Sequence, residues 1–170
     1  GTHLSTTYNY LGSATFIVEP GDEIANYTHD YKTGRDTYYF YSNIAGEDGV
    51  RAESVIDIDT QMTRSVVYRD MTKNELRSET FYSLTGTKGE ERADYTINYK
   101  LDGKTVKSTT KYTYEAIAIQ PDREKQRMTQ SDTYDGEGIT GAHLSTTYNY
   151  LGSETLVVEP GDEIANYTHD

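Results

Sequence analysis

The first thirty residues of this chain recur almost unchanged at its end. Residues 1–30 read GTHLSTTYNYLGSATFIVEPGDEIANYTHD, and residues 141–170 read GAHLSTTYNYLGSETLVVEPGDEIANYTHD, so 26 of 30 positions are identical. Self-similarity at a fixed period is the signature of repeat architectures. We therefore expect residues 1–140 to be one complete repeat unit and residues 141–170 to begin the next, within a longer tandem array. The four differences are Thr2/Ala142, Ala14/Glu154, Phe16/Leu156 and Ile17/Val157.

The amino-acid composition favours β-structure. The chain holds 17 Tyr and 25 Thr among its 170 residues, and both types are enriched in strands. A mean hydropathy of −0.80 alone would fit disorder, but disordered chains are poor in aromatic and β-branched residues. We expect an ordered, all-β chain with a thin core, in which Tyr supplies much of the buried area.

Turn signals rich in Gly, Pro, Asn and Asp recur along the chain and separate segments of strand length. Ser54–Asp59 and Asp94–Tyr99 alternate polar and apolar residues, which is typical of antiparallel sheet with one buried face. Asp102-Gly103 predicts a two-residue type I′ hairpin turn. Arg123–Arg127 fits either a short helical turn or a charged loop. We expect strands at 4–10, 14–19, 24–31, 36–42, 50–58, 62–69, 75–83, 91–100, 105–119, 126–134, 144–150 and 154–159.

These patterns together predict an all-β tandem repeat, a β-solenoid or spiral of antiparallel hairpins with a period of 140 residues. The two ends of such an array present strand edges that invite association. We therefore expect the partner to be the protein itself, through neighbouring repeats or end-to-end stacking.

The charge of the chain opposes several kinds of partner. Its net charge is −12, and because residues 141–170 hold five acids and no Lys or Arg, one 140-residue unit carries −7. Nucleic acids and anionic membranes need basic patches, so we expect no binding to nucleic acid. No window approaches the roughly 18 apolar residues of a membrane helix, so we expect no membrane insertion. The absence of Cys excludes disulfides and thiolate metal sites.

Several segments share one form: a Tyr, a short turn, a polar strand and another Tyr. They read YNYLGSATFIV (8–18), HDYKTGRDTYYFY (29–41), VVYRDMTKNELRSETFY (66–82), INYKLDGKTVKSTTKYTY (97–114) and DTYDGEGITGAHLSTTYNY (132–150). This resembles the YD repeats of the RHS and teneurin families, and Tyr134-Asp135-Gly136 is the closest match. Tyr31, Tyr68 and Tyr99 keep the Tyr without the adjacent Asp. The resemblance implies consecutive hairpins wound into a spiralling β-sheet, as a hollow shell or a solenoid.

No catalytic motif stands out, and we expect no enzymatic activity. The chain has no Cys nucleophile, no Gly-x-Ser-x-Gly and no phosphate-binding Gly loop. Paired carboxylates could serve glycoside hydrolysis, but an active site copied every 140 residues would be unusual. The four histidines are two residues seen twice, which favours packing or surface roles: His3, His29, His143 and His169.

Two motifs within the repeated thirty residues are candidate binding or modification sites. An acidic corner around Pro20-Gly21 could hold Ca²⁺, which takes six to eight oxygens; its alternative is a solvated β-turn. Asn26 and its copy Asn166 begin Asn-x-Thr glycosylation sequons. The candidate Ca²⁺ ligands are Glu19, Asp22 and Glu23, with their copies Glu159, Asp162 and Glu163.

The first functional hypothesis is a structural repeat of a giant extracellular or cell-surface protein that forms a fibre. The second is a repetitive adhesin stalk whose exposed Tyr rings stack on glycans. The third is a YD-type shell segment that encloses a toxin or other cargo. For the fibre, the candidate structural tyrosines are Tyr8, Tyr10, Tyr39, Tyr41, Tyr95, Tyr99, Tyr112 and Tyr114.

Overall fold

The computed structural model describes residues 4–42, 49–70, 72–84, 87–116, 126–153 and 156–170, and this part of the chain is all-β. One short 3₁₀ helix, η1 (Ala52–Ser54), is the single helical element among these residues. The strands are β1 (Ser5–Tyr10), β2 (Ile24–Asp30), β3 (Arg35–Tyr41), β4 (Val50–Arg51), β5 (Met62–Tyr68), β6 (Leu76–Ser83), β7 (Arg92–Tyr99), β8 (Val106–Tyr114), β9 (Met128–Asp135), β10 (His143–Tyr150), β11 (Gly152–Ser153), β12 (Leu156–Val157) and β13 (Ile164–His169).

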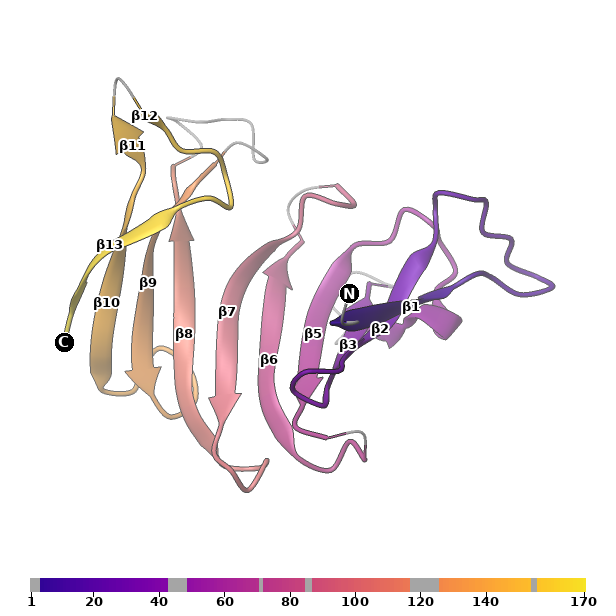
Figure 1. The fold of residues 1–170 in the computed structure, drawn as a ribbon, viewed down its shortest axis with the longest axis horizontal. Coiled ribbons are helices and arrows are strands. Elements are labelled where there is room, and N and C mark those ends of the chain that lie inside the picture. Colours follow the sequence, from indigo (N-terminus) through magenta and orange to yellow (C-terminus); the bar gives the residue numbers. More distant parts are fainter. Residues whose placement is uncertain (1–3, 43–48, 71, 85–86, 117–125, 154–155) are drawn as a thin grey trace. The chain divides into compact units, whose positions relative to one another are not determined.

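The principal sheet has 11 antiparallel strands in the order β1-β2-β3-β5-β6-β7-β8-β9-β10-β13, with β4 paired to β3 (Figure 1). β1 and β13 stand at the two ends of this order, so the sheet is not closed on itself. β11 and β12 form a separate two-stranded sheet. The chain divides into two compact parts, residues 1–92 with 99–105, and residues 93–98 with 106–170.

The predicted strands coincide with most of the observed ones. Segments 24–31, 62–69 and 75–83 contain β2, β5 and β6, and segment 36–42 covers β3 from its second residue onward. The all-β prediction is confirmed. The physical reason is that these segments combine strand-forming residues such as Tyr, Thr and Val and are separated by short polar turns. Residues 117–119 of the expected strand 105–119, and most of Arg123–Arg127, lie outside the described residues.

The strand predicted at 50–58 is wrong beyond its first two residues. β4 ends at Arg51, the chain turns through η1, and Val55 is buried while Ile56 is 71 % exposed. The Asp57 carboxylate accepts the N–H of Asp59 at 3.0 Å, which is a local turn that competes with strand pairing. The alternating apolar residues Ile56 and Ile58 are exposed and half-buried, so the alternation in Ser54–Asp59 does not mark a strand with a buried face.

The strand predicted at 14–19 is also wrong. Ser13 closes a tight turn, since its N–H donates to the Phe16 carbonyl at 2.7 Å and its hydroxyl accepts the N–H groups of Thr15 and Phe16. Serine side chains favour such turns over extended backbone. One isolated bridge, Gly12 to Ile17, is the pairing in this segment. Of the expected strand 154–159, residues 154–155 lie outside the described residues, and the described part forms a strand at β12 alone.

The hairpin turn at Asp102-Gly103 is longer than predicted. A type I′ turn needs positive φ at both central residues, but only Gly103 has it, at 64°. Gly103 N–H donates to the Lys100 carbonyl at 3.0 Å, which places Asp102 and Gly103 in the second half of a four-residue turn. The Asp102 carboxylate then accepts the N–H groups of Lys104 and Thr105 and the hydroxyl of Thr105. These hydrogen bonds lower the pKa of Asp102 to about 2.

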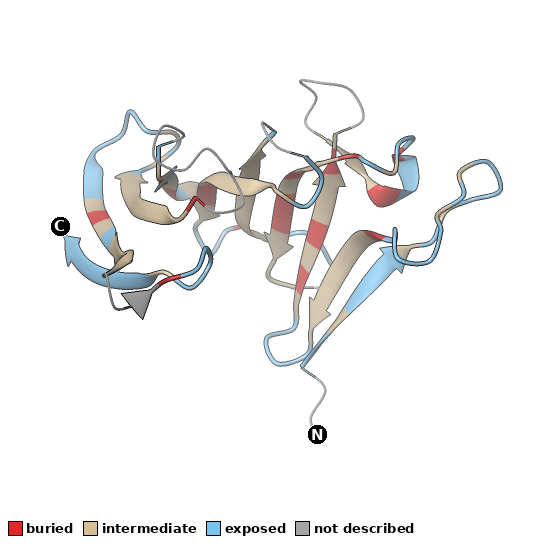
Figure 2. Cartoon of the chain, turned by 90° about the horizontal axis from the view of Figure 1, so that it is seen from above, coloured by how far each residue is buried: buried red, intermediate tan, exposed pale blue. Residues whose placement is uncertain are grey.

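A small apolar core lies in the first compact part, where η1 covers the ends of β2 and β3. Its buried members are Ile24, Tyr41, Ala52 and Val55. Figure 2 shows such buried positions on inner strands, while the strand that ends at the C-terminus is exposed throughout. The partly buried residues packed on this core are Tyr10, Phe16, Tyr39, Val50 and Met62.

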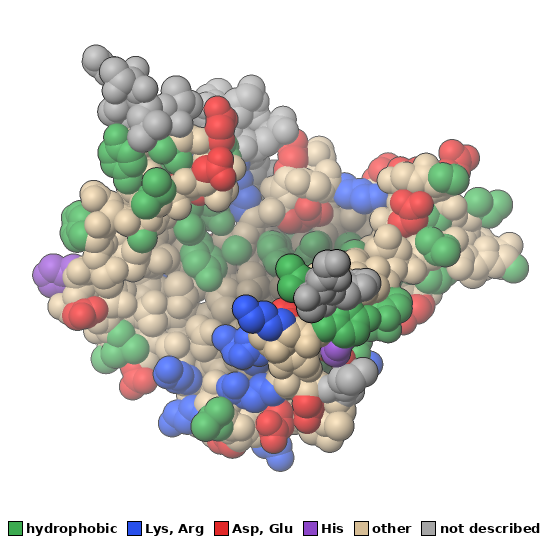
Figure 3. All heavy atoms as spheres, in the orientation of Figure 1, with side chains coloured by type: hydrophobic (Ala, Val, Ile, Leu, Met, Phe, Trp, Pro, Cys, Tyr) green, Lys and Arg blue, Asp and Glu red, His purple; other side chains and the backbone are tan. Residues whose placement is uncertain are grey.

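Acidic, basic and hydrophobic side chains all share the face of the molecule seen in Figure 3. Large apolar side chains reach the surface in turns, for example Leu11 and Leu101. Among the described residues, no helix has the length and apolar character that crossing a membrane requires.

Candidate functional site

The boundary at residue 141, where the thirty-residue segment recurs, is the strongest candidate for a functional surface, and we call it the junction. β10, the copy of β1, lies between β9 and β13. β9 pairs with one edge of β10, from Gln130 opposite Tyr148 to Tyr134 opposite His143. β13 pairs with the other edge and places Tyr167 opposite Tyr148. The last strand before residue 141 and the first strand of the recurring segment are thus neighbours in one sheet.

The two copies of the repeated segment fold alike. Tyr8 faces Tyr27 and Tyr148 faces Tyr167, and in both pairs the register shifts directly after the first Tyr. Their surroundings differ, however. Ile24 is 2 % exposed in the core, whereas its copy Ile164 is 60 % exposed, because no counterpart of β3 and η1 follows β13 within the chain.

Side chains add polar contacts to the β9–β10 pairing. The Thr146 hydroxyl donates to the Asp132 carboxylate. Asn149 donates its side-chain N–H to the Met128 carbonyl at 3.0 Å. The Arg127 guanidinium donates to the Leu151 carbonyl. The junction is therefore held by specific side-chain contacts as well as by backbone pairing.

The carboxylate of Asp132 sits among donors at this junction. Partial burial alone would raise its pKa, but hydrogen bonds from Thr146, Gln130 and His143 outweigh that effect and lower it. His143 Nε2 lies 2.9 Å from the Thr146 hydroxyl oxygen and 3.6 Å from an Asp132 oxygen. Asp132 thus remains an ionised acceptor that ties β9 to β10.

A glutamate just before β13 spans the whole junction. Glu163 Oε1 accepts the main-chain N–H of Met128, the first residue of β9, at 2.8 Å, and its Oε2 accepts the N–H of Gly161 at 2.9 Å. Glu91, just before β7, does the same with Met62, the first residue of β5, at 3.0 Å, and with Gly89 at 2.9 Å. We call this arrangement the glutamate clamp.

The recurrence of the clamp coincides with a shorter likeness inside the repeat unit. Residues 21–32 read GDEIANYTHDYK and residues 89–100 read GEERADYTINYK, identical at seven of twelve positions. Residues 62–65 and 128–131 read MTRS and MTQS. This likeness lies within the 140-residue period and is visible in the sequence. Because the clamp joins residues 29 and 35 positions apart, the likeness alone could not reveal its contacts.

The same tyrosine hydrogen bonds recur at corresponding positions. The Tyr41 hydroxyl donates to the Ala25 carbonyl at 2.7 Å, and Tyr114 donates to that of Ala93 at 3.0 Å. Tyr39 and Thr28 hydroxyls lie 3.0 Å apart, and those of Tyr112 and Thr96 lie 3.1 Å apart. Thr63 donates to the Phe40 carbonyl as Thr129 does to that of Thr113. Four of the predicted structural tyrosines thus occupy two matched pairs of positions.

The other four predicted tyrosines lie in different surroundings. Tyr8 is half-exposed on β1, and Tyr10 packs against Phe16 with ring centroids 6.4 Å apart. Tyr95 is half-buried on β7. The Tyr99 hydroxyl donates to the Glu79 carboxylate at 2.5 Å.

An aromatic ladder crosses four neighbouring strands, and Tyr8 is the one predicted tyrosine in it. Tyr8 stacks on Tyr27 at 4.5 Å, Tyr27 stacks on Tyr38 at 5.4 Å, and Tyr38 meets Tyr68 edge-on at 5.7 Å. The guanidinium of Arg51 lies 4.4 Å from the centroid of Tyr38. The cross-strand register determines which tyrosines stack, because only residues opposite or diagonal to each other on neighbouring strands bring their rings together.

The candidate Ca²⁺ ligands form a β-turn at each copy. Asp22 N–H donates to the Glu19 carbonyl at 3.0 Å, and Asp162 N–H donates to that of Glu159 at the same distance. Hydrogen bonds from its own N–H and from that of Gly21 lower the pKa of Glu23. Within the described ranges, no group of three or more His, Asp or Glu side chains is placed to hold a metal ion.

The two sequon asparagines differ in their surroundings. The Asn26 side-chain oxygen accepts a hydrogen bond from Arg51, and its amide donates to Glu53 at 3.2 Å. Asn166 is exposed on β13. Glycosylation of either residue stays a prediction.

The histidines also differ between copies. His29 Nδ1 lies 2.6 Å from the buried carboxylate of Asp36. His143 belongs to the junction, and His169 is exposed at the end of β13. His3 lies outside the described residues.

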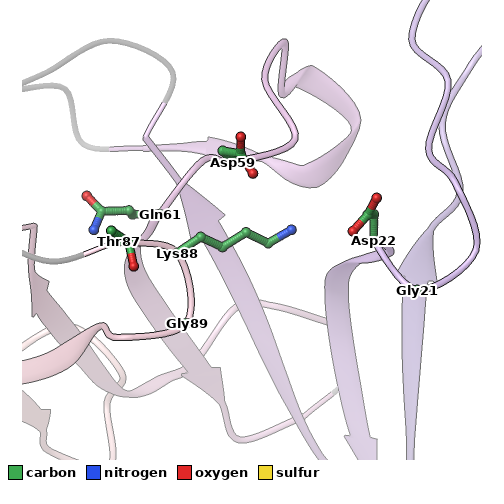
Figure 4. A pocket seen from close by; sticks show the side chains of 7 residues that line it. All are labelled: Gly21, Asp22, Asp59, Gln61, Thr87, Lys88 and Gly89. Atoms are coloured by element: carbon green, nitrogen blue, oxygen red, sulfur yellow. The ribbon is translucent and has the colours of Figure 1, made fainter. Parts of the chain in front are cut away.

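A shallow polar recess of about 770 Å³ lies beside the first acidic turn (Figure 4). The Lys88 side chain extends across it in the direction of Asp22, and Asp59 lies above (Figure 4). Two carboxylates, one ammonium, one amide and one hydroxyl make this lining suited to polar contacts. Its residues are Gly21, Asp22, Asp59, Gln61, Thr87, Lys88 and Gly89.

No protein-family model matches the chain, and comparison with curated proteins and with solved structures found no match. The resemblance to YD repeats therefore stays a prediction from the sequence.

Proposed function

We propose that this chain is a segment of a giant repetitive protein whose 140-residue units join into one continuous antiparallel sheet, forming an extracellular or cell-surface fibre. The position of β10 carries the proposal: this copy of β1 pairs with the last strand of the preceding unit on one edge and with β13 on the other. A repeat joined by a linker would leave that edge unused. The partner is then the protein itself.

The number of strands supports the proposal. The path from β1 to β9 contains eight strands, with β4 off the path. An even number of antiparallel strands returns the chain to its starting direction, so the same thirty residues can take the same place in each unit. Neighbouring strands lie about 4.8 Å apart, so one unit would add about 38 Å along the sheet.

The recurring contacts support a shorter step of four strands within each unit. By sequence likeness and by the matched hydrogen bonds, β6, β7, β8 and β9 correspond to β1, β2, β3 and β5. Each half would bury its edges against the next, so that stability is a sum of unit and neighbour terms. The absence of Cys is compatible with this arrangement, because neighbouring strands replace disulfides as the source of cohesion.

Electron microscopy of the native material tests the fibre. Thin unbranched filaments with an axial repeat that holds one 140-residue unit would support it. Separate beads on flexible linkers would contradict it. Compact closed shells would also contradict it and would favour the YD-type shell that encloses a toxin or cargo.

A glycan-binding adhesin stalk is the second candidate, favoured by one observation. Tyr148 is still 36 % exposed although β9 and β13 flank it, and its ring stacks on Tyr167 at 4.8 Å. Rings exposed in this way can stack on sugars. Glycan titration followed by NMR tests this function: shifts confined to these tyrosines would support it, and an unchanged spectrum with every glycan class would reject it.

A further inference from the structure

We infer that the outer edge of β1 is a docking surface for the segment Arg127–Asp135 of another copy of this chain. The inference rests on the proposed function, because it assigns the contact through which one unit receives the one before it. It commits to one occupant, a strand of β9 sequence, at one edge.

The receiving surface is present twice in the chain. At the second copy, β9 lies along β10 and contacts that strand and the turn before β13. At the first copy, β1 stands at the end of the strand order. Residues that contact the segment Arg127–Asp135 are identical in the two copies, among them Thr146, Tyr148, Asn149, Leu151 and Glu163, which correspond to Thr6, Tyr8, Asn9, Leu11 and Glu23.

A third instance shows which features of the surface recur. β5 pairs with β6 in a matching register, with Arg64 opposite Phe81, and Glu91 accepts the first N–H of β5. Both docked strands begin with Met-Thr-x-Ser, at Met62 and at Met128. The occupied edges therefore share a strand sequence, a register and a glutamate clamp.

Glu23, in the turn before β2, already has the turn contact that the two occupied clamps show. Glu23 Oε2 accepts the N–H of Gly21 at 3.1 Å, as the same oxygens of Glu91 and Glu163 accept the N–H of their own glycines. In those two clamps the other oxygen takes the Met N–H. Strand addition to a sheet edge obtains affinity from backbone hydrogen bonds and specificity from such side-chain contacts.

A photo-crosslinking peptide locates the contact. The probe is a synthetic peptide of residues 126–136 with benzoylphenylalanine in place of Gln130, the residue that faces Tyr148 at the occupied junction. On β1 it would face Tyr8. Cleavage after glutamate separates fragments 1–19 and 138–154, whose masses differ. We expect crosslinks on the first fragment, while crosslinks on the second would mean that the peptide had replaced β9 and would overturn the inference.

Two matched substitutions test the role of the clamp. Glu23→Gln should weaken peptide binding to the full chain about tenfold, because a charge-assisted hydrogen bond becomes a neutral one. Glu19→Gln removes the same charge from the same turn. It should leave the affinity for the peptide within about twofold, because Glu19 accepts the Asp22 N–H through its main-chain carbonyl, which the substitution keeps. Equal affinity of the Glu23→Gln variant and the original chain, or equal binding of a scrambled peptide, would overturn the inference.

The outcome is separable from that of the proposed function. Filaments in the microscope without peptide binding would keep the fibre and reject this edge as its contact. Peptide binding together with separate beads would keep the edge and reject the fibre.

Discussion

The carboxylate of Glu163 accepts the main-chain N–H of Met128 at 2.8 Å and so ties the turn before β13 to the first residue of β9. Between these two elements lies β10, the first strand of the recurring segment 141–170. Glu91 makes the corresponding contact with Met62 at 3.0 Å. A glutamate in the turn before a strand thus makes the same long-range contact at both places.

Removing an occupied clamp should destabilise the chain. Glu91→Ala leaves the N–H groups of Met62 and Gly89 without their carboxylate acceptor, which should lower the free energy of unfolding by about 1–3 kcal/mol. Glu23→Ala removes the corresponding contact with the Gly21 N–H but no contact like that of Glu91 with Met62. It should therefore lower the free energy of unfolding by less. Urea unfolding of both variants measures the difference, and equal losses would contradict the account.

Two glycines in turns separate backbone strain from steric crowding. Gly34 and Gly103 have φ values of 68° and 64°, so alanine is strained at both. A Cβ at Gly34 meets nothing within 4 Å, whereas one at Gly103 would lie 2.5 Å from the Glu75 Cα. Gly34→Ala should cost about 1 kcal/mol and Gly103→Ala at least about 1 kcal/mol more. Similar unfolding midpoints for the two variants would show that the β7–β8 turn does not pack against Glu75.

Asp102 should contribute stability that acid removes. Its pKa is lowered from 3.8 to about 2 by hydrogen bonds from Thr105 and Lys104. Because the folded pKa is the lower one, the contribution is full above about pH 4 and is lost as the pH falls towards 2. Asp102→Asn should therefore flatten the stability profile between pH 4 and pH 2. Thermal unfolding across this range measures it, and an acid limb as steep as that of the original chain would refute the assignment.

Tyr41 should make the fold sensitive to alkali. Burial raises its pKa well above the ordinary value of 10, so the phenol stays neutral in the fold. Stability from this group is full below pH 10 and is lost as the pH rises further. Tyr41→Phe should cost about 1 kcal/mol at neutral pH through the lost bond to the Ala25 carbonyl. It should also weaken the decline in stability above pH 10, which titration followed by circular dichroism would detect; an unchanged decline would assign it to other tyrosines.

The strands could be predicted from the sequence, whereas several turns could not. β-Branched and aromatic residues marked β2, β3 and β5, because strand preference is local. The errors fell where one side chain bonded its own backbone, at Ser13 and Asp57, or where one apolar side chain, Val55, left the strand path to cover a core. Those choices depend on contacts distant in sequence.

The junction was predictable in part. The repeated thirty residues indicated that Gly141 begins a second unit, and the shorter likeness of GDEIANYTHDYK to GEERADYTINYK is present in the same sequence. The acidic corner suggested Ca²⁺, but in the structure Glu163 accepts backbone N–H groups. The acidic residues of this corner could be identified from the sequence, but their hydrogen-bond partners could not, because these depend on which strands are neighbours in the sheet.

Amide hydrogen exchange followed by NMR tests most directly whether β10 is held between neighbouring strands. Thr6–Tyr10 and Thr146–Tyr150 have the same sequence, so their intrinsic exchange rates match. The account predicts slow exchange for the β10 amides that face β9, and exchange at least about tenfold faster for the same amides in β1. Equal exchange at the two copies would contradict the continuous sheet through the repeat boundary.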